Sequence, residues 1–182
     1  MTPRASIPAP GDSRSRLLAF LSALCFFLSA VEYMIPKPLP FMRLGIANLP
    51  LLLAVDLLPF GPFLALAAVK VLGMSLVTGS LFSYVALFSL AGTLCAALVM
   101  YGARALFRSR ISAVGISVLG AVSSNAVQVV LASLVVFGRA ARIIAPVFLA
   151  MGLATGLALG AFAERFSASS RWYARAREDA RG

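Results

Sequence analysis

Residues 17–35 read LLAFLSALCFFLSAVEYMI, and this apolar run decides the class of fold. As a helix it is long enough to cross the hydrocarbon core of a bilayer, which is roughly 30 Å thick. Arg14 and Arg16 precede it, as in a signal peptide, but it holds Glu32 rather than a small-residue cleavage site. The run ends at PKPLP, residues 36–40, where the prolines prevent a helix from continuing. The stretch therefore predicts a first transmembrane helix.

The composition of the whole chain supports the same class. Of its 182 residues, 61% are hydrophobic and 12% are charged, whereas a typical soluble domain has about 45–50% apolar and about 25% charged residues. No soluble fold of this length hides so much apolar surface, and the apolar residues come in long blocks. The net charge of +10 comes from Lys and Arg residues placed mainly between these blocks. We therefore interpret the charge as a topology signal and expect no nucleic-acid binding.

Further apolar segments extend the pattern to six candidate spans. We expect one domain over residues 17–163, between a disordered tail over residues 1–16 and a basic tail over residues 164–182. The second segment is short for a bilayer, so we expect it to be tilted, broken or partly buried in protein. The sequence thus predicts an all-α, polytopic membrane protein with six transmembrane helices. Besides residues 17–35, the expected spans are residues 44–58, 63–77, 84–105, 111–137 and 143–163.

The distribution of basic residues predicts the orientation of these spans. With six spans, both termini lie on the same side of the membrane. Most Lys and Arg residues then fall on that side, in the two tails and in the loop between the fourth and fifth spans. The positive-inside rule therefore predicts cytoplasmic termini, in a multi-pass protein of the cell (inner or cytoplasmic) membrane.

Groups for catalysis and metal binding are scarce. The chain has no histidine and six acidic residues. The adjacent acidic pair, Glu178 and Asp179, lies in the predicted C-terminal tail, so paired aspartates that hold Mg²⁺ against a diphosphate are missing. Cys25 and Cys95 lie inside apolar segments without CxxC spacing, and we interpret them as packing residues rather than zinc ligands. We expect no enzyme activity, no metal and no cofactor.

Polar side chains inside the predicted spans are the candidates for function, because such groups are costly at membrane depth. Glu32 lies near the outer end of the first span, where the helix dipole disfavours a carboxylate, so we expect it to have a cationic partner. Lys37 and Arg43 are the nearest cations in sequence. Two interpretations stay open: a structural ion pair, or a charged element at the mouth of an outward-facing pocket.

Four further polar residues are candidates for a substrate site. Asn48 comes early in the second span, and Lys70 lies deep in the third, where it needs a partner or water. Asp56 is a candidate partner for Lys70, although it lies toward the cytoplasmic end. Asn125 and Gln128 are three residues apart in the fifth span and share a helix face. Their amides either contact a small polar substrate or cross-link helices, and both interpretations stay open.

Small residues at helical spacing predict close helix contacts in lipid. Gly152, Gly156 and Gly160 form two consecutive GxxxG steps in the sixth span, which we interpret mainly as packing within the bundle. Ala19 and Ala23 form a similar pair in the first span. For this pair, packing within the chain and contact with another protein both stay open.

Three motifs, in this order along the chain, resemble those of one family. They are RLGIANL at residues 43–49, GSLFS at residues 79–83 followed by FSLAG at residues 88–92, and GISVLGA at residues 115–121 followed by Asn125 and Gln128. The family is heptaprenyl diphosphate synthase component I, also called the Gx transporter family. It is similar to the substrate-binding S components of energy-coupling factor transporters, and the resemblance covers about Val31 to Phe162.

The resemblance implies a six-helix S component that captures a vitamin-like or precursor molecule from outside the cell. It further implies that the chain docks on a transmembrane coupling subunit driven by two ATPase subunits. In S components an AxxxA motif on the first helix contacts the coupling subunit, and Ala19 and Ala23 match this motif. One position departs from the family: Ser124 stands where a histidine is common. An imidazole-mediated substrate contact is therefore not expected at that position.

Three functional hypotheses follow. The first is the S component, with substrate contacts in the region Lys37–Asn48 and at the amides of the fifth span. The second is a non-catalytic membrane subunit of heptaprenyl diphosphate or quinone biosynthesis, working beside a soluble, aspartate-rich synthase. A stand-alone channel or facilitator is the third. The Ala19/Ala23 face and the outward polar residues favour the first, because a simple membrane anchor needs neither.

Overall fold

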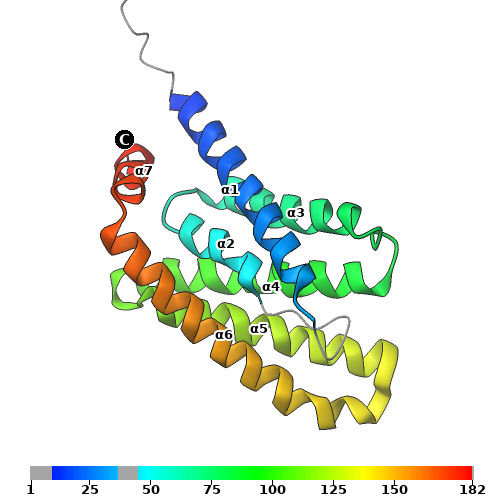
Figure 1. Ribbon diagram of the computed structural model, residues 1–182. Coiled ribbons are helices and arrows are strands. Elements are labelled where there is room, and N and C mark those ends of the chain that lie inside the picture. Colours follow the sequence, from blue (N-terminus) through cyan, green and yellow to red (C-terminus); the bar gives the residue numbers. More distant parts are fainter. Residues whose placement is uncertain (1–9, 37–44, 182) are drawn as a thin grey trace, which may run out of the picture.

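The computed structural model describes residues 10–36 and 45–181, and this part of the chain is entirely helical apart from turns (Figure 1). Single-turn 3₁₀ or π segments join several of the α-helices, among them the 3₁₀ turn η1 (Ile46–Asn48) and the π segment η3 (Ser133–Phe137). The α-helices are α1 (Pro10–Met34), α2 (Leu49–Ala54), α3 (Phe60–Val77), α4 (Tyr84–Phe107), α5 (Ala113–Ala132), α6 (Ala141–Ser169) and α7 (Arg171–Arg181). The predicted all-α class is therefore confirmed.

Four stretches of helix in the described residues are long and apolar enough to cross a membrane. They are Arg14–Met34, Tyr84–Phe107, Ala113–Phe137 and Ala141–Ser169. They coincide with the first, fourth, fifth and sixth predicted spans and indicate a multi-pass membrane protein. The third predicted span corresponds to a shorter apolar helix, Phe60–Leu76.

The second predicted span, residues 44–58, does not form one continuous helix in its described part. The turn η1 leads into α2, whose six residues include Pro50 near the N-terminus. A helix of this length is only about 9 Å long, far short of a bilayer. Instead, α2 is enclosed by its neighbours, and Leu51 is fully buried in a cluster with Leu21 of α1 and Leu66 of α3. The broken, protein-buried alternative is thus the one that the structure adopts.

Both ends of the described chain are more helical than expected. Helix α1 begins at Pro10 rather than at Leu17, and α6 continues to Ser169, beyond the predicted end at residue 163. Helix α7 then forms inside the segment that the sequence analysis assigned to a basic tail. Its Tyr173 is only 4% exposed and its hydroxyl donates a hydrogen bond to the backbone carbonyl of Leu53, over 3.3 Å. The helix therefore folds back onto α2.

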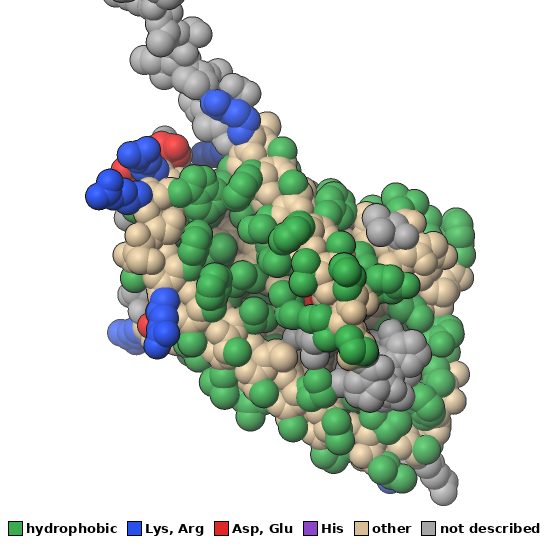
Figure 2. Space-filling view, in the orientation of Figure 1, with side chains coloured by type: hydrophobic (Ala, Val, Ile, Leu, Met, Phe, Trp, Pro, Cys, Tyr) green, Lys and Arg blue, Asp and Glu red, His purple; other side chains and the backbone are tan. Residues whose placement is uncertain are grey.

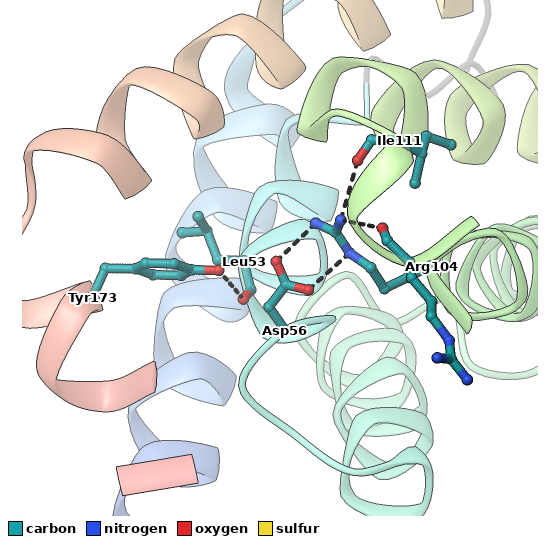
Figure 3. Close-up of polar contacts among 6 residues, drawn as sticks. Leu53, Asp56, Arg104, Ile111 and Tyr173 are labelled. Carbon is teal, nitrogen blue, oxygen red and sulfur yellow. Dashed lines mark hydrogen bonds and ion pairs between the residues drawn. The ribbon is translucent and has the colours of Figure 1, made fainter. Parts of the chain in front are cut away.

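An ion pair fixes the end of α2 beside this contact (Figure 3). The Arg104 guanidinium of α4 meets both carboxylate oxygens of Asp56, each over 2.8 Å. Its Nη1 also donates to the backbone carbonyls of Arg108 and Ile111, over 3.0 and 3.1 Å. Asp56 is therefore paired with Arg104 and not with Lys70, which corrects the partner suggested from the sequence. The pair joins the segment after α2 to α4, and the same guanidinium also binds the loop between α4 and α5.

The docking of α7 is expected to weaken at high pH. Burial, with the nearby Asp56 carboxylate, raises the pKa of Tyr173 to about 12 from an ordinary value of 10.0. The folded state thus binds the phenolic proton more tightly than the unfolded state. The protonated Tyr173 hydroxyl therefore contributes to the free energy of unfolding, by about 1.4 kcal/mol for each pKa unit between the two states. This contribution is complete below pH 10 and is lost as the pH rises to 12. Fluorescence of Trp172, followed against pH, is expected to change in this interval, and Tyr173→Phe is expected to remove the change. An identical change in Tyr173→Phe would contradict the assignment.

The glycine stripe of α6 packs against α5, which confirms the interpretation as internal packing. A Cβ atom on Gly156 would lie 3.0 Å from the Cα of Val118, and one on Gly160 would lie 2.5 Å from the Cα of Val114. Both obstructing atoms belong to the backbone, which cannot move aside as a flexible side chain can. Because these glycines have no side chains, the two helices can approach each other closely along this stripe.

Gly160→Ala is expected to destabilise the protein by about 1–3 kcal/mol, because the added methyl group forces α5 and α6 apart. Gly102→Ala on α4 is the matched control, since a Cβ there meets no atom within 4 Å. Thermal unfolding of the detergent-purified variants measures the effect. The Gly160 variant is expected to unfold at a lower temperature, and the control at the wild-type temperature or slightly above. Equal unfolding temperatures would show that the helices are not in close contact.

Candidate functional site

The candidate site is a cavity of about 250 Å³ between the helices. It lies beside the C-terminal part of α1 and the turn η1, and it is bounded by α3, α4, α5 and α6. Its polar lining residues are Ser29, Glu32 and Tyr33 of α1, Asn48 of η1, Lys70 of α3, Thr78 and Ser80 after α3, Thr93 of α4, Ser124 and Asn125 of α5, and Thr155 of α6. A partly open cavity that combines apolar walls with several polar side chains suits a small solute.

Glu32 connects α1 to the segment that leads into α2. Its two carboxylate oxygens accept hydrogen bonds from the backbone N–H groups of Gly45 and Ala47, each over 3.2 Å. Gly45 has a φ of +81°, a left-handed conformation that favours glycine. The carboxylate thus receives donors from the backbone while it lines the cavity. Lys37 and Arg43, the suggested cationic partners, lie outside the described residues.

Lys70 brings a cationic group to the same cavity. Its side chain is 4% exposed, and its ammonium group donates a hydrogen bond to the Oδ1 atom of Asn48. The contact joins α3 to η1 and orients the amide of Asn48. Burying an ammonium group at membrane depth is costly, and the polar groups of the cavity offset part of this cost. Glu32, Asn48 and Lys70 therefore line one cavity from three different elements.

The two amides of α5 take different positions. Asn125 lines the cavity, and its Nδ2 atom donates to the backbone carbonyl of Phe148 over 2.6 Å, which cross-links α5 to α6. Gln128 is 1% exposed and is not among the residues that line the cavity. Its Nε2 atom donates to the hydroxyl of Ser124 over 3.3 Å. Asn125 therefore cross-links two helices and also lines the cavity, whereas Gln128 contacts Ser124 outside the cavity lining.

Several hydroxyl groups of the cavity were not identified from the sequence. Ser29 and Thr93 are each 4% exposed and face the cavity from α1 and α4. The Oγ atom of Ser29 has no hydrogen-bond partner among the described residues. Serine and threonine are common in apolar helices, so sequence alone gave no signal for these two. An unpaired buried hydroxyl beside a cavity favours a ligand or water as its partner.

These features define a multi-pass, all-α membrane protein with a partly open cavity among its helices, lined in part by polar side chains. Residues 21–166 match the family model for heptaprenyl diphosphate synthase component I. The match covers most of the chain, so the protein belongs to this family, and the resemblance found in its motifs is confirmed. The comparisons found no matching curated protein and no matching solved structure.

Proposed function

We propose that the protein is the substrate-binding membrane subunit, or S component, of an energy-coupling factor-type importer for a small vitamin-like or precursor molecule. The observation that carries the proposal is the cavity lined by Glu32, Lys70, Asn48 and Asn125. A membrane anchor has no use for two buried, oppositely charged side chains beside a space of this size. A solute-binding subunit needs such groups to orient a polar ligand.

The outer surface of α1 supports a partner protein in the membrane. Ala19 and Ala23 are both exposed in the isolated chain, and so are the neighbouring large side chains of Phe20 and Phe27. Small residues four apart, bordered by aromatic rings, allow the backbone of another helix to approach closely. The proposed partner is a transmembrane coupling subunit driven by two ATPase subunits. In this arrangement both termini lie in the cytoplasm and the cavity lies toward the outer face.

A second candidate function follows from the family's own name. The protein would then be a non-catalytic membrane subunit that supports heptaprenyl diphosphate or quinone biosynthesis beside a soluble synthase. This candidate explains the family name and the membrane location. It gives no role to the cavity, which is why the importer is the better supported of the two.

Co-purification of the tagged full-length protein from its native membrane in a gentle detergent distinguishes the candidates. The importer predicts recovery of a polytopic membrane protein together with two ATP-binding subunits. Recovery of a soluble, aspartate-rich synthase in their place would support the second candidate. If neither set of partners is recovered, both candidate functions are contradicted.

A further inference from the structure

A second hollow lies at the opposite end of α1 from the candidate site. It is a groove of about 460 Å³ between the N-terminal part of α1 and α7. Tyr173 holds α7 in place through its contact with Leu53, so both walls of the groove are fixed. Because α7 directly follows the membrane-spanning helix α6, the groove lies where the chain leaves the bilayer.

The groove carries a net positive charge. Arg14 and Arg16 approach from α1 and Arg175 from α7, and Asp179 is the acidic residue among those that line it. The space-filling view shows Lys and Arg side chains at this end of the molecule and again lower on the left edge, while hydrophobic side chains cover much of the remaining visible face (Figure 2). Guanidinium groups match the geometry of phosphate oxygens and bind them through paired hydrogen bonds.

The rest of the groove is apolar and aromatic. Leu17 and Phe20 of α1 and Leu57 line it beside the arginines. The rings of Phe20 and Trp172 lie with their centroids 5.1 Å apart. Phe20 is also 52% exposed, so the apolar wall continues onto the exposed surface of α1. Tryptophan next to arginine is typical of the level of lipid headgroups.

We propose that this groove binds one anionic glycerophospholipid of the cytoplasmic leaflet. The phosphate lies among Arg14, Arg16 and Arg175, and the acyl chains run along Leu17 and Phe20. Charge complementarity selects an anionic headgroup, and the continuous apolar wall selects a lipid over a free anion. Basic pockets beside membrane-spanning helices bind such headgroups by the same chemistry. None of the residues that line this groove lines the candidate site.

The chain contains a single tryptophan, Trp172, and this residue lines the groove. Its fluorescence therefore reports lipid at this position directly. The full-length protein is reconstituted in phosphatidylcholine vesicles that contain a fixed minor fraction of a brominated lipid, either phosphatidylglycerol or phosphatidylcholine, with bromine close to the headgroup. Brominated phosphatidylglycerol is expected to quench Trp172 with an apparent selectivity of roughly tenfold over brominated phosphatidylcholine.

The triple variant Arg14→Gln/Arg16→Gln/Arg175→Gln is expected to lose this selectivity. A matched variant removes the same charge outside the groove: Arg165→Gln/Arg171→Gln/Arg177→Gln is expected to keep it. Equal quenching by the two brominated lipids in the wild-type protein would overturn the proposal. An equal loss of selectivity in both triple variants would also overturn it, because it would indicate diffuse attraction of anionic lipid. Displacement of the brominated lipid by excess glycerol 1-phosphate would overturn it as well, because it would indicate a site for a free anion.

Discussion

Replacing Ala19 and Ala23 with leucine is expected to reduce strongly the recovery of the proposed coupling subunit with the tagged protein. Both alanines are exposed on α1, one turn of helix apart, so neither substitution disturbs the interior of the chain. Leucine side chains would hold a partner helix away from the α1 backbone and remove the close contact that small residues permit. We expect co-purification to fall at least tenfold, a change of roughly 1.4 kcal/mol in binding free energy.

Helix α6 provides the matched control for this double substitution. Ala154 and Ala158 are exposed and four residues apart, with the same spacing as the pair on α1. Ala154→Leu/Ala158→Leu therefore adds the same apolar volume to another lipid-facing surface and is expected to leave the recovery unchanged. If both double variants retained the partner, the α1 face would not be the docking surface. If both lost it, the effect would be general and the assignment to α1 would be wrong.

Lys70→Met is expected to lower the affinity for the proposed solute by about 100-fold, which corresponds to roughly 2.7 kcal/mol. Methionine keeps much of the length of the side chain but removes the ammonium group and leaves the Oδ1 atom of Asn48 without its donor. Loss of one charged partner in a buried polar contact costs roughly 2–5 kcal/mol. Equilibrium dialysis against the solute released from wild-type protein measures the change.

Thr155→Val is the control for a change in the cavity wall. Thr155 also lines the cavity, but its hydroxyl already donates to the carbonyl of Met151 in its own helix, over 2.8 Å. Removing this hydroxyl is therefore expected to change the affinity by only about 2- to 12-fold, which corresponds to roughly 0.5–1.5 kcal/mol. An unchanged affinity in Lys70→Met would show that the solute binds elsewhere.

The long apolar helices were predictable because their signal is local. The runs that became α1, α4, α5 and α6 each carry enough apolar residues to identify a span without knowledge of the rest of the chain. The fate of residues 44–58 depended instead on tertiary packing. This run is apolar because α2 is buried by α1 and α3, and composition alone does not separate burial in protein from burial in lipid.

For the C-terminal segment the prediction erred in the opposite direction, because it missed helix α7. Its many arginines suggested only a basic tail, yet Trp172, Tyr173 and Ala176 form an apolar face on α7. These three residues are one, three and four positions apart, as on one face of a helix, but the many charged residues around them obscured the pattern. The docking of Tyr173 on Leu53 involves residues 120 positions apart and was beyond any local pattern.

For the candidate site, the sequence identified the chemistry better than the partners. Glu32 and Lys70 stood out because charged residues are rare at membrane depth, and both line the cavity. Their hydrogen bonds to backbone N–H groups and to Asn48 required the three-dimensional arrangement. Ser29 and Thr93 could not have been selected, since small hydroxyl residues in apolar helices are common in packing as well as in binding.

The most direct test of the account is to measure what the protein carries. The full-length protein is purified from its native membrane, washed and denatured, and the small molecules released are quantified by mass spectrometry. Ser29→Phe, which places a ring in the cavity, is purified in parallel and must remain monodisperse. We predict that the wild-type protein releases one solute in an amount comparable to the protein and that Ser29→Phe releases almost none. If the wild-type protein releases no more solute than Ser29→Phe does, the proposal of a substrate-binding subunit is contradicted.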